Sequence, residues 1–218
     1  MDVDRRQFLK SMGFAGLAGA SRHRPLWAMT AAEEQSTRPI TVLVTGTAER
    51  SGFIHGVHAA NPAVSLLRAD LVLDFLRHLK NVIESGRAAR VIGMVDDACG
   101  ALIIDSVRTS GAKLQWLGQH AVDAGRSRHR VLGGALADSC AIRFGEQLDA
   151  CGGNFNLTGQ RLGGDTPLQL AADLREGKHE GDWTAALGFA LTAPGAAVPR
   201  FRPAAPLMGH FVSFLLET

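Results

Sequence analysis

The stretch RVIGMVDDACGALIIDSVRTSGAKLQWL, residues 90–117, decides the predicted fold class. Its first six residues are largely apolar and β-branched, which predicts a strand. Asp97 is a typical helix N-cap and Gly111 a typical helix stop, so we expect a helix over Ala98–Ser110. A further strand is expected over 113–117. Strand, helix and strand in this order predict parallel pairing through a right-handed crossover.

The same pattern returns 41 positions further along the chain. At that shift Asp97, Cys99, Gly111, Gly118 and Gln119 align with Asp138, Cys140, Gly152, Gly159 and Gln160. Helix capping alone explains the Asp and Gly matches, but it does not explain the cysteine or the Gly-Gln pair. We therefore predict a single α/β domain over 33–218, with a mostly parallel sheet, helices on its faces and a partly duplicated strand–helix–strand unit.

The remaining segments are expected to extend this sheet. In chain order the expectations are a strand at 40–44, a loop at 45–61, a helix at 65–84, a short helix at 166–177, a strand or short helix at 182–192, an extended Pro-rich surface segment at 193–206, and a terminal strand at 207–216 on the sheet's edge.

The N-terminus, MDVDRRQFLK, carries a motif of a different kind. Arg5, Arg6, Phe8, Leu9 and Lys10 match the pattern of twin-arginine signal peptides, which this segment resembles. In that family a Ser or Thr stands where this chain has an Asp. The apolar stretch that follows is too short to span a bilayer. The resemblance implies a removed signal over 1–32, export of the folded protein by the twin-arginine translocon, and a periplasmic or otherwise exported location in a bacterium.

Composition sets limits on the partners. Apolar residues make up 46% of the chain and charged residues 20%, as in ordinary globular proteins, and the formal net charge is only +2. Basic residues are scattered without aromatic stacking platforms, which argues against nucleic-acid binding. The local cluster Arg126–Arg130 is interpreted as a solvated loop rather than an anion site. No segment of the mature chain has the apolar length of a stable membrane span.

Two repeated helix starts are the main binding candidates. Asp97 with Cys99, and Asp138 with Cys140, are expected at the carboxyl edge of the sheet, where open α/β folds place ligands. A cysteine in the first helical turn has a favoured thiolate, so the two thiols could form a disulfide, hold a ligand or simply pack as small buried residues.

Two weaker candidates complete the set. Gly159 and Gln160 begin a Gly-rich stretch that could be an anion-binding loop or a plain turn. His55 and His58 could chelate a metal from a loop, although two unrelated exposed histidines is the favoured interpretation. No cysteine spacing indicates haem or an iron–sulfur cluster, and the sequence identifies no cofactor.

Two classes of function follow from these observations. The favoured hypothesis is an exported accessory subunit of a periplasmic redox enzyme, which acts by binding a protein partner rather than by catalysis. The alternative is a periplasmic enzyme or small-ligand-binding protein that uses the carboxyl edge near Asp97, Cys99 and Asp138. The sequence does not decide whether the chain is an enzyme.

Overall fold

The structure is a computed structural model of the full chain, and it describes residues from Arg38 onward with internal gaps. The described ranges are 38–69, 72–85, 87, 89–123, 126–133, 140, 143–148, 154–161, 167–168, 182–202 and 207–218. The predicted signal peptide, Asp138 and Gly152 lie outside these residues, so the expectations attached to them stay predictions.

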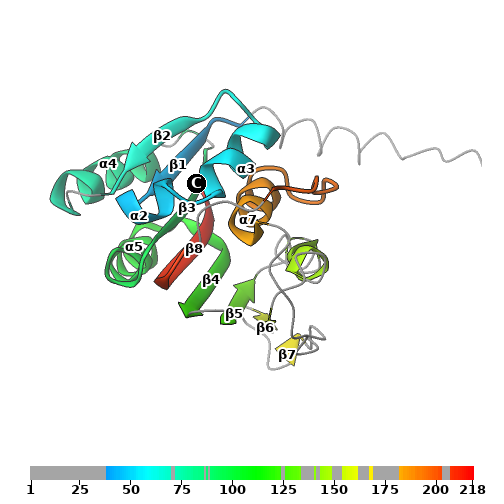
Figure 1. The fold of residues 1–218 in the computed structure, drawn as a ribbon. Helices are drawn as coiled ribbons and strands as arrows, with labels where there is room; N and C mark the ends of the chain where they lie inside the picture. The colour runs from blue at the N-terminus through cyan, green and yellow to red at the C-terminus, as the bar shows by residue number, and fades with distance from the viewer. Residues whose placement is uncertain are drawn as a thin grey trace, which may run out of the picture. The chain divides into compact units, whose positions relative to one another are not determined.

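The described residues form an eight-stranded sheet in the order β2-β1-β3-β8-β4-β5-β6-β7 (Figure 1). The strands are β1 Ile40–Val44, β2 Ser65–Arg68, β3 Arg90–Asp96, β4 Lys113–Asp123, β5 Arg126–Gly133, β6 Asn154–Arg161, β7 Pro167–Leu168 and β8 Gly209–Glu217. The helices are α2 Gly46–Glu49, α3 Phe53–Ala60, α4 Val72–Glu84, α5 Asp97–Ser110 and α7 Trp183–Thr192, and residues 140 and 143–148 are also helical.

The α/β class predicted from the sequence is confirmed, but the mostly parallel sheet is wrong. β1 pairs in parallel with β2 and β3, and β5 with β6. The β3–β8, β4–β8, β4–β5 and β6–β7 pairings are antiparallel. Two of these antiparallel pairings arise because β8 lies between β3 and β4 and runs opposite to both, and a third arises because β4 and β5 form a hairpin.

β8 is therefore a central strand, whereas the sequence analysis expected it at an edge. Six consecutive residues, 211–216, are buried. Phe211 and Leu215 face one apolar layer, while Val212 and Phe214 face the other. Because a central strand is covered on both faces, its sequence is apolar without alternation, and this continuous run was the available signal.

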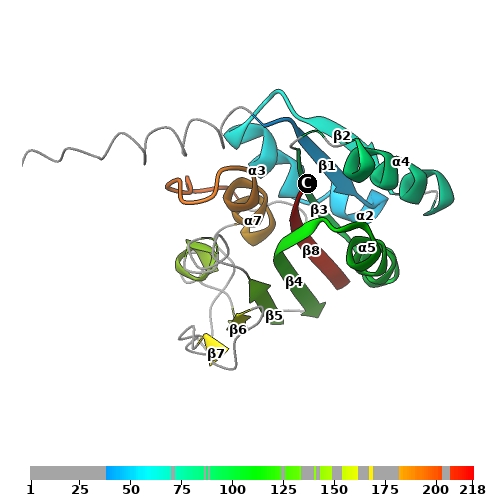
Figure 2. The ribbon, with the colours of Figure 1, turned by 180° about the vertical axis from the view of Figure 1, so that it is seen from behind.

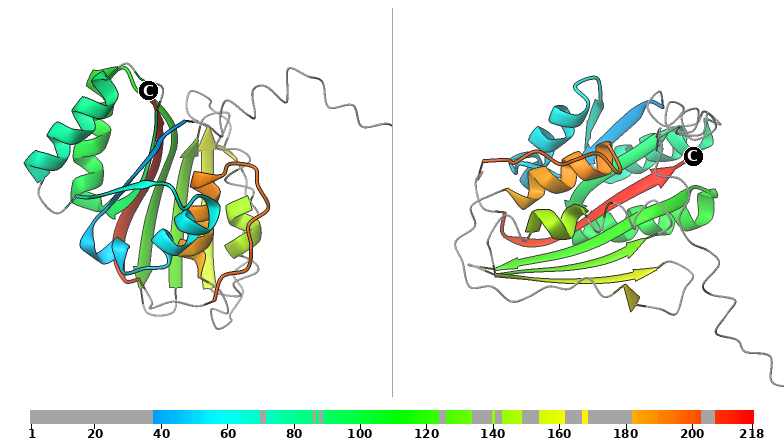
Figure 3. Two further views of the ribbon diagram at one scale, coloured as in Figure 1. Left: turned by 90° about the horizontal axis from the view of Figure 1, so that it is seen from above. Right: turned by 90° about the vertical axis from the view of Figure 1, so that its right-hand side faces the viewer.

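The helices divide between the two faces of the sheet (Figures 1 and 2). α4 and α5 pack on one face, which we call the α5 face. α2, α3, α7 and the helical residues 140 and 143–148 pack on the other, the α7 face (Figure 3). Four connections join strands that run in the same direction: β1 to β2, β2 to β3, β3 to β4 and β5 to β6. In all four, the helices between the strands lie on the face that a right-handed crossover requires.

The two predicted strand–helix–strand units are present in different forms. In the second unit β5 and β6 are adjacent and parallel. In the first unit β3 and β4 run the same way, but β8 lies between them. The N-cap of α5 is Asp96, one residue before the predicted Asp97, and its carboxylate accepts a hydrogen bond from the Cys99 amide at 2.9 Å. Gly111 ends α5 in the left-handed region, as predicted.

Two other predicted elements need correction. The segment 45–61, expected as a loop, contains α2 and α3, and the expected helix over 65–84 is the strand β2 followed by α4. The glycines in this segment suggested a loop, but Gly56 lies in α3 and allows this helix to pack closely against α7. A Cβ there would overlap the backbone carbonyl of Ala185 on α7.

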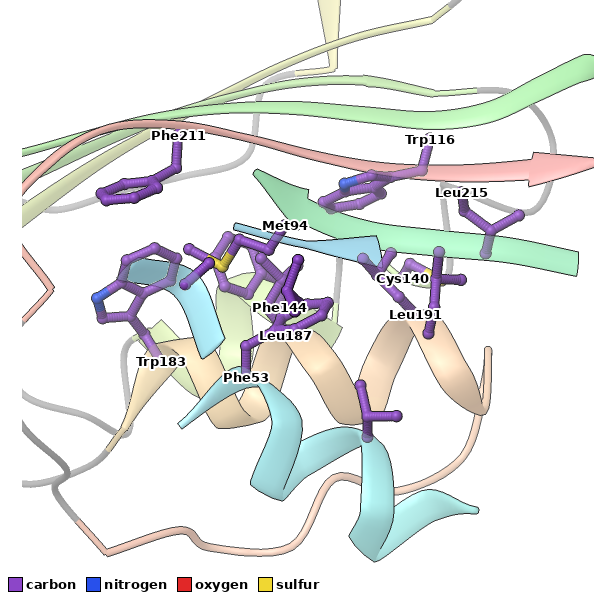
Figure 4. Packing of buried hydrophobic residues seen from close by; sticks show 14 of the residues in the cluster. Phe53, Met94, Trp116, Cys140, Phe144, Trp183, Leu187, Leu191, Phe211 and Leu215 are labelled. Carbon is purple, nitrogen blue, oxygen red and sulfur yellow. The ribbon is translucent and has the colours of Figure 1, made fainter. Parts of the chain in front are cut away.

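The larger core lies on the α7 face (Figure 4). Trp183, Leu187 and Leu191 project from α7 toward the strands, where Met94 and Trp116 meet them. These side chains are all at most 7% exposed. Burying an aliphatic or aromatic side chain of this size contributes about 1.5–3 kcal/mol, so this layer fixes the positions of β4 and β8 beneath the candidate site.

Candidate ligand-binding groove

On the α5 face, the apolar layer ends partway along β4 and β5. Leu117 on β4 and its register partner Leu132 on β5 belong to the apolar cluster under α5. Beyond them the side chains on this face become polar. On β5, alternation places Arg126, Arg128 and Arg130 there, all three exposed, because successive side chains on a strand point to opposite faces.

The strand register aligns these polar side chains in two rows. One row runs His210, Ala121, Arg128 and Asn156 across β8, β4, β5 and β6. The next runs through Gln119, Arg130 and Thr158 on β4, β5 and β6. Neighbouring strands are about 4.8 Å apart, so side chains in one row lie within reach of a single small molecule.

A groove of about 430 Å³ lies over these rows. Its lining residues are Asp97, Gln119, His120, Ala121, Arg128, His129, Arg130, Asn156, Thr158, His210 and Phe211. Ala121 is the small member of its row, between His210 and Arg128. A short side chain between long ones leaves the hollow, and its volume falls in the range of small-molecule sites.

The charged groups of the groove do not neutralise one another. Within the described part of the chain, no ion pair joins Asp97, Arg128 or Arg130 to any other group. The guanidinium groups of both arginines are thus available as planar, bidentate donors. Asn156 and Thr158 are exposed beside them on β6 and supply further donors. The groove is rich in hydrogen-bond donors, and its walls are polar.

A buried polar chain lies on the opposite face of the same strands. Nδ1 of His120 is 2.8 Å from Nδ1 of its register partner His129. Nε2 of His120 is 2.7 Å from Oγ of Ser213, and Nε2 of His129 is 2.9 Å from Oγ of Ser127. Trp116 donates its Nε1–H to the Ser213 hydroxyl at 2.9 Å. All of these groups are buried.

Neutral imidazoles of complementary tautomers satisfy every hydrogen bond in this chain. Where two Nδ1 atoms form a hydrogen bond, one donates and the other accepts. If His120 donates from Nδ1, its Nε2 accepts from Ser213, and His129 donates from Nε2 to Ser127. The reverse assignment also satisfies every ring nitrogen. The aromatic rings of Trp183 and Phe144 pack against His129, with ring centroids 4.7 and 5.4 Å away.

Burial lowers the pKa of His120 to about 3, because the charged imidazolium would lose its hydration.

Gly118 makes room for this chain because it has no side chain. A Cβ at Gly118 would overlap Oγ of Ser213 and Nε2 of His120. The Gly-Gln pair noted in the sequence therefore serves both faces: Gly118 leaves room for the buried chain, and Gln119 lines the groove.

The predicted site residues separate in the structure. Asp97 is exposed and lines the groove. Cys99 is 6% exposed, with its thiol 3.7 Å from the Ala69 carbonyl oxygen. Cys140 is 2% exposed, with its thiol 3.5 Å from the Ala190 carbonyl oxygen. The two cysteines lie in core layers on opposite faces of the sheet, so they do not form a disulfide with each other.

None of the other candidates is among the residues that line the groove. Gly159 and Gln160 are in β6, not in a loop, and pair with β5 and β7. His55 and His58 are exposed residues of α3, where His55 packs edge-on against the ring of Phe201. No group of three or more His, Cys, Asp or Glu side chains suited to a metal ion occurs among the residues described.

Sequence reasoning missed the arginines, although a signal was present. The run Arg126 to Arg130 alternates Arg, Ser, Arg, His, Arg and leads into Val131 and Leu132. Alternation with period two indicates a strand, whereas the high density of charge suggested a solvated loop. The prediction of a loop is wrong, since this run is β5. Asn156 and Thr158 had no local signal, because only the β5–β6 register places them in the groove.

Comparisons with protein-family models, curated proteins and solved structures find no match. In the part of the chain that the structure describes, no helix is both long and apolar enough to cross a membrane. The groove's own chemistry is therefore the basis for a functional proposal.

Proposed function

We propose that this protein binds a small molecule carrying a carboxylate or phosphate group in the groove on the α5 face of β4, β5 and β6. The observation that supports it most is the pair Arg128 and Arg130, side by side on one strand face and without an ion-pair partner in the described chain. Guanidinium groups recognise such oxyanions through two parallel hydrogen bonds. This proposal develops the small-ligand alternative predicted near Asp97, Cys99 and Asp138: it keeps Asp97, leaves out the buried Cys99, and does not depend on Asp138.

Binding is favoured over catalysis by the composition of the groove. Its exposed groups are mainly donors, which stabilise an anion. Of the three histidines that line the groove, His210 is exposed on the groove face of β8. The ring nitrogens of His120 and His129 are in the buried chain on the other face. A general base must reach the proton that it removes, so these two buried histidines do not act as bases in the groove.

The proposal is tested by titrating the full-length protein with inorganic phosphate and with glutarate, followed by NMR. We predict saturable binding of at least one of them, weakened at least tenfold in the Arg128→Gln/Arg130→Gln double variant because the bidentate contacts are lost. Ala121→Leu should weaken binding similarly by filling the hollow without changing any charge.

Arg126→Gln is the matched control. Arg126 lies on the same strand and the same face, but it does not line the groove. The dissociation constant of the Arg126→Gln variant for either anion should stay within about twofold of that of the unmodified protein, because only the partly screened field of one neighbouring charge is lost. Equal losses in the control and the double variant would indicate general charge attraction and reject the groove as the site.

The export and partner hypotheses remain proposals of a different kind. The twin-arginine resemblance supports export to the periplasm, and an accessory role beside a redox enzyme would be compatible with a ligand-binding groove. Mass spectrometry of the protein recovered from its host tests both. A mature chain that begins near residue 33 supports export, and a co-purified redox partner supports the accessory role.

A further inference from the structure

We infer that the ligand is zwitterionic, with its anionic group on Arg128 and Arg130 and a protonated amine on Asp97. This inference rests on the proposed function, and it adds the chemical class of the ligand. The groove contains one carboxylate among its donors, and that carboxylate lies at the opposite end from the arginines. A ligand with a single negative charge would leave this end unused.

The sheet order sets the separation of the two charged ends. Asp97 directly follows β3, and the arginines are on β5, with β8 and β4 in between. Three strand spacings separate these backbones by about 14 Å. The long arginine side chains shorten the gap, yet no ion pair with Asp97 forms in the described chain. Opposite charges held apart across one groove match a ligand whose own charges are separated by a short chain.

The N-terminus of α5 does not itself attract an anion to the Asp97 end. Its exposed amides would favour negative charge, but the Asp96 carboxylate already accepts from the Cys99 amide at 2.9 Å. Asp97 then adds a second carboxylate within the first turn. Two carboxylates outweigh the roughly half unit of positive charge at a helix N-terminus. This end of the groove therefore favours a cation, such as an ammonium group.

The test is an affinity comparison of ω-amino acids with acids that lack the amine. Glycine, β-alanine, 4-aminobutyrate and 5-aminopentanoate are titrated into the full-length protein beside acetate, propionate, butyrate and pentanoate. At least one amino acid should bind about tenfold more tightly than its amine-free analogue, since a charge-assisted hydrogen bond has that magnitude. The chain length of the best ligand measures the gap between the charged ends.

Asp97→Asn separates this inference from the proposed function, because the variant should weaken binding of the amino acid without weakening binding of the simple acid. The amino acid should lose its tenfold advantage, while the simple acid should bind equally well or more tightly because a like charge is removed. Asp123→Asn is the control, since Asp123 lies on the same sheet face outside the groove.

The outcomes are distinguishable. If the simple acids bind but no amino acid binds better, or if Asp97→Asn preserves the advantage, the zwitterion inference is wrong and the oxyanion site remains. If neither phosphate, glutarate, the simple acids nor the amino acids bind, the proposed function fails, and this inference fails with it.

Discussion

At the scale of single residues, the buried pair His120 and His129 is the least ordinary feature of the fold. Two imidazoles, two serine hydroxyls and the Trp116 indole satisfy one another within an apolar layer. Buried polar groups are tolerated when each has a hydrogen-bond partner. The pair also fixes the β4–β5 register, because a slip of one strand by one residue would move its ring onto the groove face and separate it from its partner.

The pair makes stability depend on pH in a defined direction. In the folded protein the pKa of His120 is about 3, against 6.5 in the unfolded chain, so the unfolded chain binds the extra proton first. The stabilisation is present above about pH 6.5 and is lost as the pH falls toward 3, at up to about 1.4 kcal/mol per pH unit. Urea unfolding followed at several pH values between 7 and 4 measures this slope.

Two variants identify the source of that slope. In His120→Met/His129→Met the slope should flatten, since no buried imidazole remains to be protonated. Replacing the exposed His58 by Gln should leave it unchanged. A slope that is the same in the double variant as in the unmodified protein would show that other groups cause the acid sensitivity.

At the scale of elements, the contact between α3 and α7 depends on two glycines. A Cβ at Gly188 would overlap the Phe53 carbonyl oxygen, as one at Gly56 would overlap that of Ala185. The two helix backbones therefore approach each other closely. This contact holds α7, whose Trp183 packs against both buried histidines, so it supports the strands that form the groove.

Gly188→Ala should destabilise the protein by about 1–3 kcal/mol, because the added methyl forces the two helices apart. Gly145→Ala is the matched control. It is also a helical glycine, but its Cβ would meet only Leu157 Cδ2 at 3.4 Å, and the gain in helix propensity is about 0.5–1 kcal/mol. Chemical denaturation should show opposite signs for the two variants, and equal signs would contradict the close approach.

Elements that depend on local signals were predictable from the sequence. β1, β3 and the end of α5 at Gly111 follow from β-branched runs and helix-stop chemistry. The helix predicted over 65–84 was too long, because the apolar residues Leu66 and Leu67 fit helical spacing but lie in β2. Short apolar runs fit both periodicities, and only the parallel pairing of β2 with β1 decides between them.

At the scale of the whole molecule, the position of β8 determines where a ligand can bind. A fully parallel sheet would have brought Asp97 and Asp138 to one carboxyl edge, as the sequence predicted. Instead β8 and the β4–β5 hairpin reverse the direction of the sheet at its centre. The second repeat then places Cys140 on the α7 face, while Cys99 lies on the α5 face.

Of the predicted edge residues that the structure describes, Asp97 lines the groove while Cys99 and Cys140 are buried in the core layers, and the arginines come from a segment interpreted as a loop. Pairing between strands that are far apart in the sequence produces no local sequence pattern. Val122 of β4, for example, pairs with Gly209 of β8, 87 positions further along the chain, so the register could not be predicted from spacing alone.

Ligand binding in the groove is tested most directly by amide NMR during titration with the tightest-binding ω-amino acid. Binding there should shift the amide signals of Asp97, Gln119 to Ala121, Arg128 to Arg130, and Asn156 to Thr158, with little change in α3 and α4. Shifts of equal size over the whole surface, or centred on α3, would contradict the claim that the open face of β4, β5 and β6 is a binding site.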